Sequence, residues 1–94
     1  MREFQRHIAE LYLEKDRRRG VQPTFLWLME EVGELAEAVR RNERRAIEEE
    51  IADVAAWLAS LANLLDIDLE TVAAAKYPAT CRRCGHKPCT CDDG

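Results

Sequence analysis

The sequence predicts an all-α protein, and two observations support this prediction. Apolar residues recur every three or four positions through most of the 94 residues, as in amphipathic helices, and no segment alternates apolar and polar residues as a strand would. Glycine and proline number only four and three, whereas 34% of the residues are charged. We therefore expect an antiparallel bundle of three main helices and a short fourth, followed by a small cysteine-rich tail.

The first two helices are expected on either side of a glycine. The first spans about residues 2–18, and Gly20 is well placed to end it. Residues 20–23, GVQP, are expected to form a loop, and Pro23 suits the first turn of a second helix that extends to about Arg41. The apolar positions are Phe4, Ile8, Leu11 and Tyr12 in the first helix and Phe25, Leu28, Met29, Val32, Leu35, Ala36 and Val39 in the second.

The third helix carries the longest apolar stripe. Asn42 marks the turn that precedes it, and it extends to about Leu65. Residues 66–68, DID, break the pattern, and Asp68 is a plausible N-cap for a short fourth helix that ends before Pro78. A small monomer cannot cover this stripe from both sides, so we expect two chains to combine into a larger bundle. The stripe consists of Ile47, Ile51, Val54, Trp57, Leu58, Leu61 and Leu65.

The charge distribution argues against a nucleic-acid partner. The formal net charge is −4, and only Arg17–Arg19 forms a basic run, whereas phosphate binding along a nucleic acid needs clustered Lys and Arg. The N-terminal segment is interrupted by charges, and no stretch approaches the length needed to span a bilayer. We expect a cytoplasmic protein with neither a membrane nor a nucleic-acid partner.

Carboxylates crowd the flanks of the second and third helices. At about 100° per residue, Glu31 and Glu34 lie on one flank of the second apolar stripe. Glu50 and Asp53 lie on the corresponding flank of the third, so an antiparallel pairing of the helices brings the four acids into one small volume. A hard divalent cation, Mg²⁺ or Mn²⁺, would neutralise them. Geometry alone leaves a metal site and a solvated acidic face both open.

Two short motifs resemble those of a known family. EEVGE at residues 30–34, followed by EEIAD at 49–53, matches the E-E-x-x-E and E-x-x-D pattern of the MazG-like nucleotide pyrophosphohydrolases. The resemblance covers about Phe4 to Lys76. It implies an all-α enzyme that hydrolyses nucleoside triphosphates between the α and β phosphates to a monophosphate and pyrophosphate, with Mg²⁺ (or Mn²⁺) as cofactor. It also implies homodimers or tetramers.

The resemblance also assigns residues to the site. Glu30 is the first acid of the motif, and it either supports a ligand or acts as a base that positions water. Apart from the resemblance, Lys15 and Lys76 lie near helix ends and are candidates for contacts with phosphate. Similar enzymes use polar residues in the region of Asn63 toward the sugar or base, so Asn63 is a candidate for that contact. The Mg²⁺ ligands that the family pattern implies are Glu31, Glu34, Glu50 and Asp53.

The tail is a separate signal, so we divide the chain into a domain of residues 1–77 and a tail of residues 78–94. The tail contains the pattern C-x₂-C-x₄-C-x-C, with His86 available as a substitute ligand. Four thiolates at short spacing suit tetrahedral Zn²⁺, and we favour a compact zinc knuckle. The alternatives are reduced cysteines in a flexible tail and an oxidised or iron–sulfur form. The ligands would be Cys81, Cys84, Cys89 and Cys91.

Two other functions remain open. The phosphoribosyl-ATP pyrophosphohydrolases use a similar helical acid site, so that activity is the nearest enzymatic competitor. A non-enzymatic alternative is a helical dimerisation module with a zinc tail, although such a module would not need Glu50 and Asp53. The sequence indicates neither the preferred nucleotide nor whether the task is housecleaning of damaged nucleotides or control of a normal pool.

Overall fold

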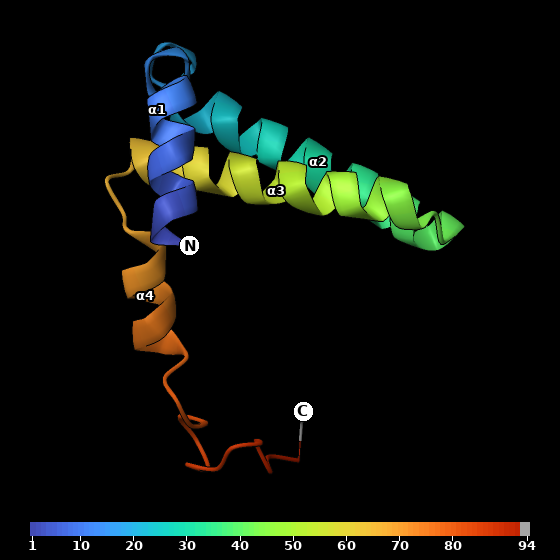
Figure 1. Cartoon of the computed structure of the whole chain (residues 1–94), viewed down its shortest axis with the longest axis vertical. Helices are drawn as coiled ribbons and strands as arrows, with labels where there is room; N and C mark the ends of the chain where they lie inside the picture. The colour runs from blue at the N-terminus through green and yellow to red at the C-terminus, as the bar shows by residue number, and fades with distance from the viewer. Residues whose placement is uncertain (93–94) are drawn as a thin grey trace.

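The computed structural model describes residues 1–92, and α-helices are the only regular secondary structure in that range (Figure 1). This confirms the all-α prediction. None of the helices within the described range is long and apolar enough to cross a membrane. The helices are α1 (Arg2–Arg19), α2 (Val21–Arg41), α3 (Arg44–Leu64) and α4 (Leu69–Lys76).

An antiparallel hairpin of α2 and α3 forms the long arm of the molecule. α3 packs most extensively against α2 and then against α1, which crosses the open end of the hairpin (Figure 1). The turn is where the sequence predicts it: Asn42 adopts the left-handed conformation with φ 56°, and its N–H donates to the carbonyl oxygen of Val39 at 3.0 Å. The flanks of α2 and α3 that carry the acids are thereby placed side by side.

The corner between α1 and α2 is tighter than the sequence indicates. The predicted loop at residues 20–23 is wrong, because Gly20 alone separates the two helices and α2 begins at Val21. The Gly20 N–H donates to the Asp16 carbonyl at 2.8 Å, and the Gly20 carbonyl accepts from the Thr24 N–H at 3.2 Å. Pro23 is compatible with this earlier start because the first N–H groups of a helix have no intrahelical partner.

α4 begins at the predicted cap and is tied to α1 by ion pairs. The Asp68 carboxylate accepts from the Thr71 N–H at 3.1 Å. Arg2 contacts Asp68 and Glu70, each at 3.0 Å. Hydrogen bonds from Arg2, and then from Thr71, lower the pKa of Asp68 to about 2. Beyond these contacts, α4 and the tail lead away from the hairpin (Figure 1).

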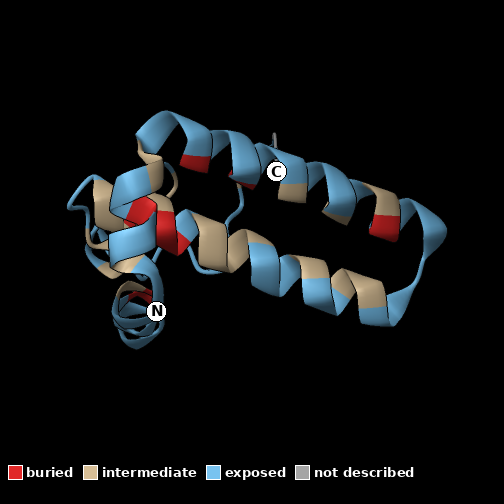
Figure 2. Ribbon diagram, turned by 90° about the horizontal axis from the view of Figure 1, so that it is seen from above, coloured by how far each residue is buried: buried red, intermediate tan, exposed pale blue. Residues whose placement is uncertain are grey.

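The buried core of a single chain is thin, as Figure 2 shows along the hairpin. The radius of gyration is 15.8 Å, whereas a compact domain of this length has about 12 Å. Several residues predicted for the core lie open to solvent, such as Phe25 (45% exposed), Leu58 (41%) and Leu65 (47%). The apolar stripes are therefore present but uncovered. The buried hydrophobic residues of the described range are Ile8, Leu28, Ala38, Ala59 and Ala62.

Candidate active site

Three of the four predicted magnesium ligands meet across the hairpin. Glu31 of α2 and Glu50 and Asp53 of α3 each offer a carboxylate oxygen, and these oxygens lie within 4.8 Å of one another. Opposite ligands of octahedral Mg²⁺ are about 4.2 Å apart, so these acids need only a small adjustment to share one ion. Glu50 and Asp53 are one turn apart on α3, and this spacing puts both on the flank that faces Glu31.

The other two acids of the first motif lie at the edge of this group. Glu34 is exposed and does not belong to the set of oxygens within 4.8 Å. Its charge nevertheless contributes to raising the pKa of Glu31, so it acts on the site electrostatically. Glu30 is exposed and also outside the group. The roles of Glu34 as a ligand and of Glu30 as a base or support stay predictions.

The clustered acids lack a positive partner. The Oε2 atoms of Glu31 and Glu50 are buried without a hydrogen bond, and no ion pair in residues 1–92 reaches either residue or Asp53. Further along α2, by contrast, Glu37 pairs with Arg41 at 3.0 Å. A buried acceptor without a partner costs about 1–3 kcal/mol, and more when charged. A hard divalent cation fits this set of oxygen donors.

The electrostatics of Glu31 fit the same interpretation. Burial, the adjacent carboxyl group of Glu50, and the charges of Glu34, Glu50 and Asp53 raise the pKa of Glu31 to about 7, from an ordinary value of 4.5. Near neutral pH, Glu31 therefore holds a proton part of the time. A cation that binds the three carboxylates displaces this proton, so its affinity rises with pH up to about 7.

A cavity of about 290 Å³ opens between α1 and α3 beside Asp53. It contains the predicted Lys15 together with a second cation, Arg19, and the aromatic side chains of Tyr12 and Trp57. The cavity thus places positive charge next to the acids, as a polyanionic substrate held through a metal ion would require. Its lining consists of Tyr12, Lys15, Asp16, Arg19, Asp53, Ala56, Trp57 and Ser60.

Arg19 is fixed in the wall of this cavity by three neighbours. Its Nη1 donates to Asp16 Oδ1 at 2.8 Å and to Thr24 Oγ1 at 3.2 Å. Its guanidinium lies 4.7 Å from the ring centre of Trp57, which stacks on Trp27 at 5.8 Å. The Nε and Nη2 groups of Arg19 make no hydrogen bond within the described range, so they remain available to a substrate oxygen.

The arrangement of motifs and acids can now be compared with known families. A model of the MazG nucleotide pyrophosphohydrolase domain matches residues 19–86. This chain belongs to the MazG family. The match includes both acid motifs and confirms the resemblance seen in the sequence. Family membership indicates a pyrophosphohydrolase-type enzyme with a nucleotide substrate, and enzymes of this type generally depend on a divalent metal. A comparison with curated proteins found no match.

Two residues of this MazG protein were missed by sequence reasoning, Asp16 and Arg19. Asp16 is only 1% exposed, and its Oδ2 is a third buried carboxylate oxygen without a hydrogen-bond partner. A signal was present: Asp16 lies in the last turn of α1, where the helix dipole disfavours an acid, and Arg19 follows at the i+3 position. An acid in that unfavourable place indicates a specific partner.

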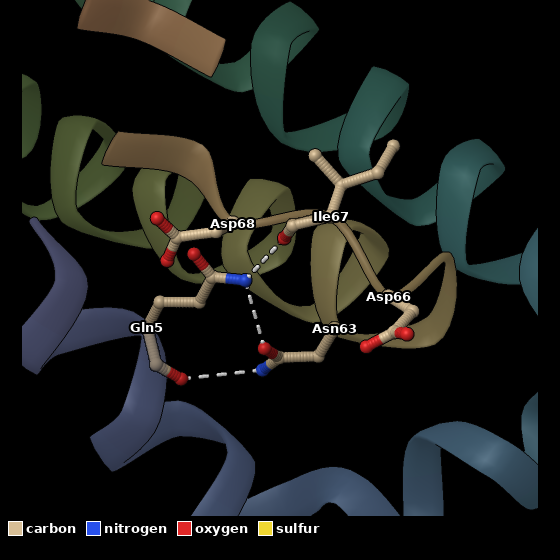
Figure 3. Close-up of a pocket in the computed structure, with 5 residues that line it drawn as sticks. All are labelled: Gln5, Asn63, Asp66, Ile67 and Asp68. Carbon is tan, nitrogen blue, oxygen red and sulfur yellow. Dashed lines mark hydrogen bonds between the residues drawn. The ribbon is translucent and has the colours of Figure 1, made fainter. Parts of the chain in front are cut away.

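The remaining substrate candidates lie elsewhere in the MazG protein. Asn63 exchanges hydrogen bonds with Gln5 at 3.0 and 3.2 Å, at the edge of a separate cavity of about 240 Å³ (Figure 3). Lys76 ends α4, with its ammonium 6.0 Å from the ring centre of Tyr77, and lines a cavity beside the tail. The structure does not bring either residue to the clustered acids, and their contact with substrate stays a prediction.

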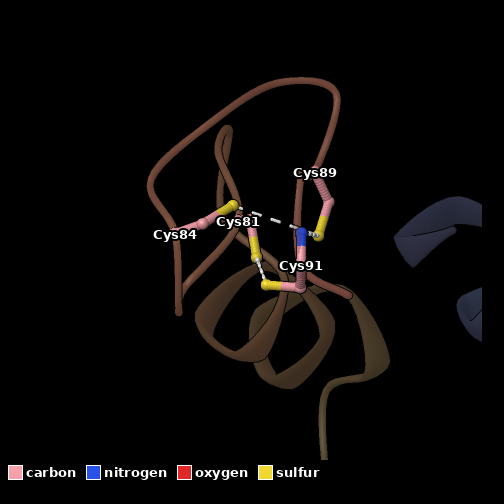
Figure 4. A group of neighbouring side chains, drawn as sticks. All are labelled: Cys81, Cys84, Cys89 and Cys91. Atoms are coloured by element: carbon pink, nitrogen blue, oxygen red, sulfur yellow. Dashed lines mark hydrogen bonds between the residues drawn. The ribbon is translucent and has the colours of Figure 1, made fainter. Parts of the chain in front are cut away.

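The tail cysteines also gather (Figure 4). Their four sulfur atoms lie within 4.8 Å of one another, and all four are free thiols. Hydrogen bonds from backbone N–H groups, first of all that of Thr90, lower the pKa of Cys84 to about 5. Within residues 1–92, two groups of side chains could therefore hold a metal, one of oxygen donors and one of sulfur donors.

Proposed function

We propose that this chain hydrolyses nucleoside triphosphates between the α and β phosphates, giving a nucleoside monophosphate and pyrophosphate, with Mg²⁺ or Mn²⁺ held by Glu31, Glu50 and Asp53. The observation that carries the proposal is a pair of buried carboxylate oxygens, one on Glu31 and one on Glu50, that have no hydrogen-bond partner. They lie close to Asp53, inside the part of the chain that matches the MazG domain. Glu34 lies one turn from Glu31 and serves as the fourth ligand after a change of rotamer.

In this proposal the substrate binds at the cavity between α1 and α3, with its triphosphate at the Asp53 end. Lys15 and Arg19 then neutralise phosphate charge from the α1 side, and the nucleoside lies toward Tyr12 and Ser60. The bound cation supplies charge neutralisation at the phosphates and lowers the pKa of a water ligand. Glu30, on the solvent side of the motif, supports a ligand or positions the attacking water.

The active form is a homodimer or tetramer that covers the apolar faces of α2 and α3. A groove of about 460 Å³ between these helices is lined by Val21, Phe25, Leu26, Leu61 and Leu65, with Gln22 as its polar member. An exposed apolar groove of this kind is typical of a protein–protein interface, and the large radius of gyration of one chain agrees with it.

Light scattering after gel filtration tests the assembly. We expect the wild-type chain at micromolar concentration to have the mass of two or four chains. L26E should shift the mass toward that of the monomer, because it replaces an apolar side chain of the groove that is 66% exposed with a charged one. Exchange of the exposed Glu49 for Gln, outside the groove, is the matched control. A monomeric wild type would refute the dimer.

The decisive experiment for the reaction is a panel of nucleoside triphosphates, with phosphoribosyl-ATP included, assayed with Mg²⁺ or Mn²⁺ and analysed for all products. We expect the monophosphate and pyrophosphate. Orthophosphate as the primary product would indicate a γ-phosphatase, and preference for phosphoribosyl-ATP would favour the competing activity. No turnover of any substrate, together with no rise in melting temperature at millimolar Mg²⁺, would leave the non-enzymatic dimerisation module.

A further inference from the structure

The four tail cysteines have the spacing of a tetrahedral thiolate site. Tetrahedral zinc with Zn–S bonds of about 2.3 Å separates its sulfur ligands by about 3.8 Å. The sulfur atoms of Cys81 and Cys91 are 3.8 Å apart, and those of Cys84 and Cys89 are 4.0 Å apart (Figure 4). Disulfide-bonded sulfurs would be about 2 Å apart, so these distances fit a shared metal ion and not a disulfide.

The segment around the cysteines has no other core. Between residues 78 and 92, Cys81, Cys84 and Cys91 are half-buried and all the other residues are exposed. An irregular segment of this length buries too little apolar surface to hold one conformation by itself. A metal bound by all four sulfurs supplies the missing stabilisation, since binding free energy becomes folding free energy in such small sites.

The backbone supports the sulfur atoms. The N–H groups of Thr90 and Cys91 donate to the sulfurs of Cys84 and Cys89 at 3.4 and 3.3 Å. Gly85, with φ 73°, allows the turn in which its N–H donates to the Cys81 carbonyl at 2.8 Å. Hydrogen bonds of this kind orient metal ligands and stabilise their charge.

His86 is not one of the ligands. Its Nδ1 forms a hydrogen bond with Thr90 Oγ1 at 3.1 Å, and the group of side chains close enough to share a metal ion consists of the four cysteines without His86. The family match ends at residue 86, so Cys89 and Cys91 lie beyond it. The complete set of four sulfurs is therefore not contained in the matched domain.

We propose that Cys81, Cys84, Cys89 and Cys91 bind one Zn²⁺ ion as a closed structural site that is independent of the carboxylate site. Four protein ligands leave no open position for a substrate, so this ion folds the tail and takes no part in hydrolysis. Soft thiolates select Zn²⁺, whereas the carboxylates suit Mg²⁺ or Mn²⁺, and each site loads without the other.

Elemental analysis of the full chain, purified under reducing conditions without chelator, tests this inference. We expect about one zinc per chain, and cobalt exchanged into the protein should show thiolate-to-metal charge-transfer absorption and the bands of tetrahedral coordination. Stoichiometric iron, or protein with less than about a tenth of a zinc per chain that also gives no thiolate absorption with cobalt, would overturn it.

Matched variants locate the metal. C81S/C84S should lose the zinc, because a tetrahedral site does not survive the loss of two ligands, whereas H86A should retain it. E50Q should also retain it, which separates this test from that of the proposed function. Circular dichroism at helical wavelengths should be nearly unchanged in all three variants, since Cys81, Cys84 and His86 lie outside α1–α4 and E50Q keeps the volume of a side chain on α3. Zinc retained in C81S/C84S, or lost in H86A, would refute the four-sulfur site.

Discussion

The two candidate metal centres differ in what holds them together. The carboxylates of Glu31, Glu50 and Asp53 project from helices whose backbone hydrogen bonds are complete without them, and their mutual repulsion opposes the packing of α2 on α3. The four cysteines lie in an irregular segment without a buried core, where Cys81, Cys84 and Cys91 are half-buried and Cys89 is exposed. The helices therefore support the first site, whereas the second site supports the segment that carries it.

This difference indicates which site serves chemistry. A site that costs the fold free energy persists only if something else makes use of it, and here a cavity with two cations adjoins it. A site that stabilises its own segment needs no further use. We therefore expect variants of the acids to change activity much more than stability, and variants of the cysteines to change the order of the tail much more than activity.

Loss of a carboxylate ligand is the largest expected effect. E50Q and D53N should each lower kcat/KM about 1,000-fold, or about 4 kcal/mol, because each removes a charged ligand while keeping the volume of the side chain. Steady-state pyrophosphate release measures this effect. E49Q, which alters an exposed acid beside Glu50 and outside the group, should leave kcat/KM nearly unchanged. Activity retained in both E50Q and D53N would contradict the assignment of the carboxylate group as the catalytic site.

Removal of the Arg19 guanidinium should have the next largest effect. R19A should raise KM about 10- to 100-fold, because one charge-assisted hydrogen bond to phosphate is worth about 1.5–3 kcal/mol. R19K keeps the positive charge but not the planar guanidinium that can donate two parallel hydrogen bonds, so its KM should lie between those of R19A and the wild type. Substrate titrations that give KM and kcat separately provide the test. An unchanged KM in R19A would show that the cavity wall does not contact the triphosphate.

The raised pKa of Glu31 predicts a smaller, pH-dependent effect. The folded protein without bound Mg²⁺ binds more protons than the unfolded chain between about pH 4.5 and 7, so this contribution to stability is present below that range and is lost as pH rises through it. Melting temperatures measured from pH 5 to 8 without divalent cations should therefore fall more steeply in the wild type than in E31Q. Equal slopes in the two proteins would contradict the assignment.

Removal of the tail should have the smallest effect on hydrolysis. A chain truncated after Tyr77 should contain no zinc but keep kcat/KM at saturating Mg²⁺ within about a factor of three, or less than 1 kcal/mol. The three clustered acids, Lys15 and Arg19 all lie upstream of the cut. A truncated chain that is helical yet inactive would show that the tail contributes to the active site, and the division at residue 77 would then be wrong.

Local pattern was enough to predict the helices and the position of the acids. Apolar spacing predicted the helices, and Gly20, Asn42 and the Asp68 cap predicted the ends of α1 and α3 and the start of α4 to about one residue; α4 ends before Pro78, as predicted. Angular position on α2 and α3 predicted that Glu31, Glu34, Glu50 and Asp53 would share one small volume. Three of them meet, whereas Glu34 stays outside the group, because helical period fixes the flank on which a side chain lies but not its distance from the facing helix.

The α1 side of the site could not be predicted in the same way. The contact between Arg19 and Trp57 depends on how α1 crosses the hairpin, and helical period fixes the face of a helix but not its crossing angle. The crossing depends in turn on the corner at Gly20, where a loop was predicted and a single residue is found. Asn63 was likewise assigned to substrate without knowledge that Gln5 would lie opposite it.

Gly20 has a wider consequence for the active site. Its φ of 94° and ψ of 168° lie in a region that is essentially restricted to glycine, although an added Cβ would come no closer than 3.9 Å to Pro23. Backbone conformation, and not space, therefore excludes other residues there. Since Lys15 and Arg19 precede this residue and Glu31 follows it without an intervening loop, the conformation of Gly20 helps to set how the cations of α1 are placed relative to the acids of the hairpin.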